Sequence, residues 1–142
     1  HSLRSFVYLV TAYLSTGLVT QILKRFVFDD FARPVKYFQD QTALHLVNGV
    51  QFFSGHSFPS GHATSAFAVF LGLAVIGNNR YLQMICFVLA CVVAYSRVYL
   101  SQHFLMDIVA GSIIGILGAL GFYLLLYIQD RNWHKWSLRK IL

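Results

Sequence analysis

The chain has 142 residues, of which 57% are hydrophobic and 11% are charged, and its formal net charge is +6. About a quarter of the residues of an average soluble domain are charged. The composition therefore favours a membrane protein over a soluble all-α core, because a domain of this size could not cover so much apolar sequence with so few charges.

Four stretches contain no charged side chain: residues 5–23, 63–79, 81–96 and 108–129. Each approaches the roughly 20 residues that a helix needs to cross about 30 Å of hydrocarbon. We therefore predict an all-α, polytopic membrane helical bundle with four visible spans. The first run could be mistaken for a signal peptide, but its long apolar core is interrupted by Tyr13 and Gln21, so we expect a retained span.

The longest connection, residues 24–61, follows the first span. It contains the sequence DDFARPVKYF, in which we expect Pro34 to stop any helix. The sequence QTALHLVNGVQFF follows, with Leu44, Val47 and Val50 at helical spacing. This spacing predicts a short interfacial helix in the outer loop.

Basic residues alternate between the two ends of the predicted bundle. One end collects Arg4, Arg80, Arg131, Lys135, Arg139 and Lys140, and the other collects Lys24, Arg25, Arg33, Lys36 and Arg97. The positive-inside rule predicts that the first end is cytoplasmic, which would make this a multi-pass protein of the cell (inner) membrane with residues 24–61 facing the periplasm or the outside. The positive charge is then explained by the orientation of the protein in the membrane, so we expect the lipid bilayer as a partner and no binding of nucleic acid. The tail RNWHKWSLRK, with Trp133 and Trp136, suits the headgroup layer.

Small residues interrupt two of the apolar runs. The last span carries Gly111, Gly115, Gly118 and Gly121 with Ser112 among them, a stripe that predicts close helix packing. The two cysteines, Cys86 and Cys91, are five residues apart and so fall on different faces of a helix. We expect neither a disulfide nor a metal site from them.

The sequence PSGH, residues 59–62, stands at the mouth of the second span. Ser60 is a favourable N-cap for a helix that starts near His62. A helix N-terminus offers unpaired N–H groups and partial positive charge to an anion, and Gly61 allows close approach to the backbone. Taken alone, the motif is equally compatible with an N-cap beside an incidental histidine.

The sequence SRVYLSQHFLMD, residues 96–107, joins the third and fourth spans. Arg97 ends one span, and His103 begins the next with Asp107 one turn later. The i, i+4 spacing predicts that the carboxylate lies beside the imidazole, where it would orient one ring nitrogen and leave the other as a lone pair.

The sequence KRFVFDDFARP, residues 24–34, adds Lys24, Arg25 and Arg33, cations that suit phosphate oxygens. Two histidines, an aspartate, fixed cations and a helix N-terminus together favour phosphoryl transfer without a metal. A two-metal site would need clustered carboxylates, and all five acidic residues are aspartates. Asp29 and Asp30 remain an alternative cation site.

The chain resembles the type 2 phosphatidic acid phosphatase (PAP2) superfamily, which shares its site with vanadium haloperoxidases. The family's motifs PSGH and S-R-x5-H-x3-D are matched by residues 59–62 and 96–107. Its K-x6-R-P motif appears here as K-x8-R-P, residues 24–34, so that either the loop bulges by two residues or Arg25 substitutes for Lys24. The resemblance also implies one PAP2-like domain over residues 1–142 and a core of six helices, two of which we expect upstream.

The resemblance implies a role for each matching residue. His103 would be the nucleophile, forming a phosphohistidine, with Asp107 as its orienting partner, and His62 would protonate the leaving oxygen. The phosphate ligands would be Lys24, Arg33, Ser60, Gly61 and Arg97, and no metal or other cofactor is implied.

The implied function is an integral-membrane lipid phosphatase that hydrolyses a phosphomonoester or a pyrophosphate of a membrane lipid. Undecaprenyl pyrophosphate, phosphatidylglycerol phosphate, phosphatidate and the lipid A phosphates all suit such a site, and we expect residues 35–53 to select among them. A lipid phosphotransferase with an alcohol acceptor is the close alternative. A non-catalytic anion-binding transporter or scaffold is the alternative of another class.

Overall fold

The structure, a computed structural model, describes residues 3–38, 44, 46, 47, 49, 51 and 53–129. Four long helices form the bundle: α1 (Leu3–Ile22), α3 (Gly61–Gly77), α4 (Arg80–Tyr99) and α5 (Leu105–Tyr123). Short π-helical segments extend α1 over Leu23–Val27 and α5 over Leu124–Gln129, and α2 (Pro34–Tyr37) is a single turn. Within the described residues every regular element is a helix, which confirms the expected all-α bundle.

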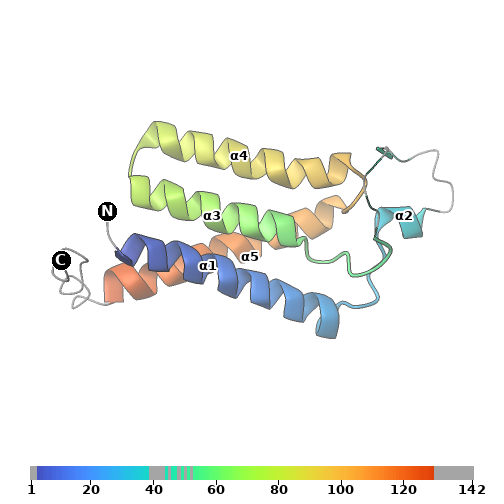
Figure 1. Ribbon diagram of the computed structural model, residues 1–142, viewed down its shortest axis with the longest axis horizontal. Coiled ribbons are helices and arrows are strands. Elements are labelled where there is room, and N and C mark those ends of the chain that lie inside the picture. The colour runs from blue at the N-terminus through green and yellow to red at the C-terminus, as the bar shows by residue number, and fades with distance from the viewer. Residues whose placement is uncertain are drawn as a thin grey trace.

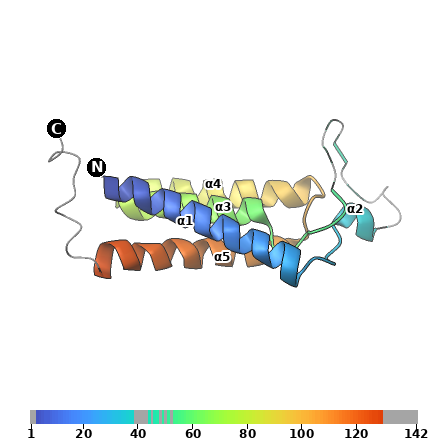
Figure 2. The same cartoon turned by 60° about the horizontal axis from the view of Figure 1, so that its bottom comes forward.

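Helix α3 lies at the centre of the bundle. It packs against α1, α4 and α5, and Figure 1 shows it between α1 and α4. Figure 2 shows α5 beneath the layer that these three helices form. Because the helices alternate in direction, α1 and α4 end where α3 and α5 begin. The predicted site residues are therefore carried to one end of the molecule, beside α2 (Figure 1).

The length and apolar character of the helices support membrane insertion. Within the described residues, three helical segments qualify as spans: Leu3–Val27, Arg80–Tyr99 and Leu105–Tyr127. The fourth uncharged run forms α3, which has 17 residues and is shorter than these three. All four expected helices are thus present among the described residues, but only three of them are long enough to qualify as spans. The shorter helix, α3, lies in the centre of the bundle and packs against the other three.

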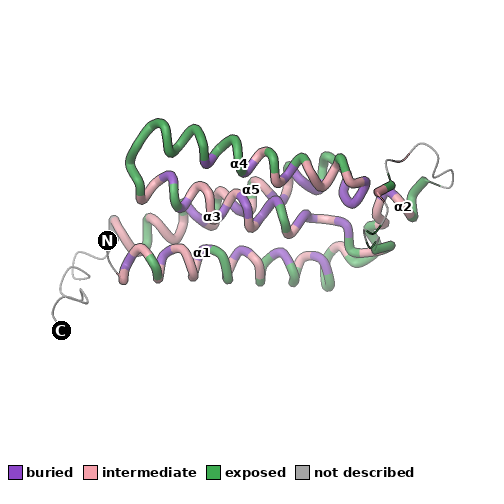
Figure 3. Tube along the Cα trace, turned by 45° about the horizontal axis from the view of Figure 1, so that its top comes forward, coloured by how far each residue is buried: buried purple, intermediate pink, exposed green. Residues whose placement is uncertain are grey.

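Side-chain size is distributed as in a membrane bundle, with small residues inside and large apolar residues outside. The buried apolar residues are mostly alanines, such as Ala63, Ala68 and Ala119, whereas Leu18 and Phe87 are more than half exposed. The first half of α4 is almost entirely exposed (Figure 3). Lipid tails are as apolar as leucine, so close packing of small residues, rather than burial of large ones, holds such helices together.

The glycines of α5 provide the closest of these contacts. A Cβ atom on Gly111 or Gly115 would collide with the carbonyl oxygens of Ser60 and Thr64 in α3, and one on Gly118 would collide with Thr16 in α1. Gly121 is different, because no described atom lies within 4 Å of its added Cβ. The predicted packing stripe therefore ends at Gly118.

The connection before α3 contains a helix, but not where the sequence spacing placed it. Pro34 does not stop a helix; it begins α2 at the N1 position, where its fixed φ suits a first turn and its missing N–H costs nothing. The described residues Leu44, Leu46 and Val47 are not helical, and Gly49 has a φ of 86°. Gln51 and Phe53 are not helical either, and the other residues of the predicted helix, including Val50, lie outside the described residues, as does the tail with Trp133 and Trp136.

We predict that Gly115→Ala destabilises the bundle. The added methyl group would meet the backbone of Thr64 and lie 3.0 Å from the amide nitrogen of Ala68, and a helix backbone cannot yield as a flexible side chain can. Overpacking of this kind costs about 1–3 kcal/mol. Gly121→Ala is the matched control. Thermal unfolding in detergent should give a lower midpoint for Gly115→Ala alone, and equal midpoints would contradict the proposed contact.

Candidate active site

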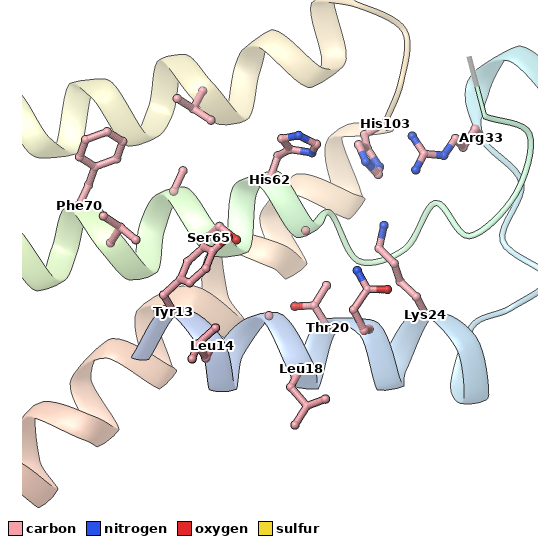
Figure 4. A pocket seen from close by; sticks show the side chains of 16 residues that line it. Tyr13, Leu14, Leu18, Thr20, Lys24, Arg33, His62, Ser65, Phe70 and His103 are labelled. Carbon is pink, nitrogen blue, oxygen red and sulfur yellow. The ribbon is translucent and has the colours of Figure 1, made fainter. Parts of the chain in front are cut away.

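The predicted site residues meet around one cavity at the end of the bundle. The cavity has a volume of about 800 Å³ and lies between α1 and α3. Its outer end is lined by Lys24, Arg33, Gly61, His62 and His103, which come from four separate parts of the chain (Figure 4). The two histidines therefore face the same space.

His103 and Asp107 form a buried pair. Nδ1 of His103 lies 3.1 Å from Oδ2 of Asp107, and the two side chains are 2% and 1% exposed. His103 precedes α5, whereas the sequence pattern had placed it at the start of the span. The same carboxylate oxygen accepts a hydrogen bond from the Phe104 amide at 3.0 Å, so Asp107 also closes the first turn of α5. Because an ionised carboxylate only accepts, Nδ1 carries the proton and Nε2 keeps its lone pair.

The environment of His103 favours its neutral form. Burial lowers the pKa of His103 below its ordinary value of 6.5. The hydrogen bond to Asp107 opposes this shift, and the nearby charges of Arg33 and Lys24 lower the pKa further. The imidazole is therefore neutral, and its lone pair available, at neutral pH.

Ser57 is a member of this group that the sequence analysis missed. Its hydroxyl donates to Oδ2 of Asp107 and lies 3.4 Å from Nδ1 of His103, and the residue is 1% exposed. Its backbone amide donates to the carbonyl oxygen of Phe31 at 3.0 Å, which fixes the loop. No spacing rule links residues 50 positions apart, so only the path of the loop reveals this contact.

The N-terminus of α3 forms the second part of the site. Ser60 is the N-cap, as predicted: its hydroxyl accepts a hydrogen bond from the Ala63 amide at 3.4 Å. Its own amide donates to the carbonyl oxygen of Asp107 at 2.9 Å, so the starts of α3 and α5 are joined. Gly61 and His62 occupy the first turn, where backbone N–H groups have no intrahelical partner and carry partial positive charge. The first turn thus faces the cavity with groups that suit an anion.

Two cations are fixed beside the histidines. Lys24 is 7% exposed, and its Nζ donates to the carbonyl oxygen of His56 at 3.1 Å. Arg33 donates from Nε to the carbonyl oxygen of Gly55 at 3.1 Å and from Nη1 to that of Gln102 at 3.2 Å. Hydrogen bonds to neutral carbonyls position both groups without neutralising them, so their charge remains available to an anion.

The structure separates Lys24 from Arg25, which the sequence left as alternatives. Lys24 is buried and lines the cavity with His103, whereas Arg25 is exposed and does not line it. Between Lys24 and Arg33 the rings of Phe28 and Phe31 pack against Phe58, with centroids 4.8 and 5.3 Å from it. This aromatic cluster packs the connection against the loop before α3.

Arg97 lies near the cavity but does not line it. It occupies the last turn of α4, and its Nη2 donates to the side-chain oxygen of Gln102. The backbone amides of Gln102 and His103 both donate to the carbonyl oxygen of Arg97, at 3.0 and 3.2 Å. Arg33 donates to the backbone carbonyl oxygen of the same Gln102, so both guanidinium groups contact one residue. Gln102 was not singled out by the sequence.

Among the described residues that line the cavity, His62 and His103 are the only side chains of a type that commonly binds metals. The described part of the chain contains no group of three or more His, Cys, Asp or Glu side chains that could hold a metal ion. Asp29 and Asp30, the alternative cation site, are both exposed. Lys24 and Arg33 make the site cationic, and its imidazoles are the side chains suited to proton transfer or nucleophilic attack.

Comparison with known proteins matches residues 5–133 to the PAP2 superfamily. The chain belongs to this superfamily. The lipid A 4'-phosphatase of Bacteroides thetaiotaomicron is 36% identical to the PAP2 chain over 80 residues, which cover 56% of the chain and 35% of that protein. The lipid A 1-phosphatase of Rhizobium etli is 34% identical over 114 residues, covering 76% of the chain and 44% of that protein.

A solved structure shares the fold. The crystal structure of Aquifex aeolicus LpxE matches with a TM-score of 0.70 and 28% sequence identity. The match covers 81% of this PAP2 chain and 64% of the LpxE chain. The PAP2 chain spans between 35% and 54% of the lengths of the curated relatives that it matches.

We predict that Ser57→Ala in this PAP2 chain raises the pKa of His103. Asp107 loses one of its donors, so its carboxylate becomes a more basic partner for the imidazole. The lost bond to a charged group should also lower the free energy of unfolding by about 1.5–3 kcal/mol. An NMR titration of the histidine ring protons measures the first effect and denaturant unfolding the second. Ser54→Ala, at an exposed position, is the control; an unchanged His103 titration in Ser57→Ala would exclude the contact.

Proposed function

We propose that the chain carries the site of a lipid phosphatase that releases phosphate from a membrane lipid. The observation that carries this proposal is the polarity of the cavity. Lys24, Arg33 and the two histidines line its outer end, whereas Leu14, Leu18, Val69 and Phe70 line the part that runs inward between the helices (Figure 4). A molecule that combines a phosphate with an apolar chain matches both parts.

In the proposed mechanism, Nε2 of His103 attacks phosphorus. A phosphorus–nitrogen bond forms as the bond from phosphorus to the lipid oxygen breaks, and His62 donates a proton to that oxygen. Water then attacks the phosphohistidine, its proton passes to His62, and the phosphorus–nitrogen bond breaks to release inorganic phosphate. Asp107 holds the Nδ1 proton of His103 throughout and stabilises the charge that the ring acquires.

The remaining residues stabilise the charge of the transferred group. Lys24, Arg33 and the N–H groups at Gly61 face the cavity and would hold the phosphate oxygens. Ser60 contributes by capping α3, because its hydroxyl is engaged with Ala63. Arg97 does not line the cavity and would act through Gln102, whose backbone carbonyl oxygen also accepts a hydrogen bond from Arg33.

The substrate class follows from the cavity and from the names of the relatives. These include lipid A phosphatases, a putative undecaprenyl-diphosphatase and a phosphatidylglycerophosphatase B. We infer that a lipid phosphomonoester or diphosphate is the substrate. Arg4 lies at the opposite end of the bundle, where it donates to the carbonyl oxygen of Leu126. The positive-inside rule then supports a site that faces the periplasm or the outside.

We predict that His103→Ala lowers phosphate release by a factor of about 10⁴ or more, because the nucleophile is lost. His62→Ala should cost about 10²–10⁴ with a lipid phosphate. With an aryl phosphate, release of the phenol in the first turnover should be slowed much less, because that leaving oxygen needs no proton. Released phosphate is the readout, and unchanged thermal midpoints control for folding. Full activity of His103→Ala would overturn the mechanism.

We also predict that chelators leave the rate unchanged, since Lys24 and Arg33 supply the positive charge that a metal would otherwise provide. Orthovanadate, which adopts the five-coordinate geometry of the phosphoryl transition state, should inhibit. Phosphate release is measured after dialysis against EDTA, with and without added Mg²⁺. A loss of activity that Mg²⁺ restores would favour a metal-dependent reaction instead.

A further inference from the structure

A second cavity adjoins the first at its cationic end. It has a volume of about 420 Å³ and lies between the end of α1 and the loop before α3. Its lining residues are Gln21, Lys24, Arg25, Arg33, Phe53, Gly55 and His56. Gln21, Lys24 and Arg33 also line the first cavity, so the two spaces share these three side chains.

The lining of the second cavity suits an anion. Three of its side chains are cationic, and none of its described lining residues is acidic. The guanidinium carbon of Arg33 lies 5.4 Å from the ring centre of Phe53, a cation–π contact that helps to hold it in place. Arg25 is exposed and contributes a third cation to the lining.

Lys24 and His56 form the wall of this cavity through two reciprocal contacts. Nζ of Lys24 donates to the carbonyl oxygen of His56, and Nδ1 of the His56 ring donates to the carbonyl oxygen of Lys24 at 3.2 Å. His56 reaches this position with a φ of 53°, in the left-handed region. These two hydrogen bonds join the loop to the end of α1 and hold this wall of the cavity in place.

The residues of α1 and of its π-helical extension are divided between the two cavities. Leu14 and Leu18 line the apolar part of the first cavity, Lys24 lies at its outer end, and Arg25 lines only the second cavity. A lipid chain in the apolar part would occupy the inner side of the phosphate site. The second cavity, whose lining includes neither Leu14 nor Leu18, would then remain open to an anion.

We propose that the second cavity binds inorganic phosphate after its release and forms the route by which it leaves. This inference rests on the proposed function, because the phosphate is its product. Lys24 and Arg33 touch both spaces, so the ion can pass from one to the other without losing its cationic partners. The lipid product then leaves along the apolar side and the anion along the cationic side.

Binding of inorganic phosphate tests the inference independently of turnover. Isothermal titration of the detergent-solubilised protein at constant ionic strength should find two phosphate ions per chain. Arg25→Gln should weaken the second ion by about fivefold or more, as expected for loss of one exposed cationic partner, while Arg25→Lys retains it. Lys36→Gln is the matched control, because Lys36 is an exposed cation that lines neither cavity.

A titration in the presence of a lipid monophosphate distinguishes binding of inorganic phosphate from binding of a lipid headgroup. In the His103→Ala variant, which cannot turn the lipid over, saturation with the lipid should leave one site for inorganic phosphate, and Arg25→Gln should weaken that site. A single phosphate site in the wild type, or equal binding by Arg25→Gln and Lys36→Gln, would overturn the inference. Two sites without any phosphate release from lipids would support the second anion site and contradict the proposed hydrolysis.

Discussion

The arrangement of the site at the outer end of the bundle depends on the hydrogen bonds of Asp107. Its Oδ2 accepts hydrogen bonds from His103, Ser57 and the Phe104 amide, and its backbone carbonyl accepts one from the Ser60 amide. These contacts join the starts of α3 and α5 to both loops that enter the site. A buried charge is tolerated only when it is hydrogen-bonded, so the same bonds that stabilise Asp107 also hold the imidazole in one orientation.

The close packing of α3 and α5 makes this contact possible. Gly111 lies one turn after Asp107, and its missing side chain leaves room for the carbonyl oxygen of Ser60. With a larger residue there, the helix starts would separate and the bond from Ser60 to Asp107 would be lost. The small residues that let the membrane helices pack closely therefore also set the distances between the reactive groups, because the same helices carry both.

Polarity changes along α1 in a way that matches an amphiphilic ligand. The helix presents Leu14 and Leu18 to the inner part of the first cavity and Lys24 to its outer end, and Arg25 then lines the second cavity. A substrate with an apolar chain would be bound in a single orientation, with its phosphate beside His62 and His103. In the exit route that we propose, the same change in polarity would separate the path of a lipid from the path of an anion.

The sequence by itself determined the features that depend on neighbouring residues. Uncharged runs predicted the four helices, the spacing of His103 and Asp107 predicted their contact, and Ser60 was predicted as the N-cap of α3. Each of these predictions depends either on residues within four positions of one another, whose relative placement helix geometry fixes, or on an unbroken run of apolar residues. The prediction at Pro34 was wrong because proline both ends helices and begins them, and only its surroundings distinguish the two.

The tertiary structure alone decided which distant residues meet. It placed Lys24 rather than Arg25 beside the histidines, through a hydrogen bond to His56, 32 residues away. It brought Ser57 to Asp107 across 50 residues and Gln102 to Arg33 across 69, and it ended the glycine contacts at Gly118. Such contacts follow from how helices cross and loops return, and no periodicity in the chain encodes these distances.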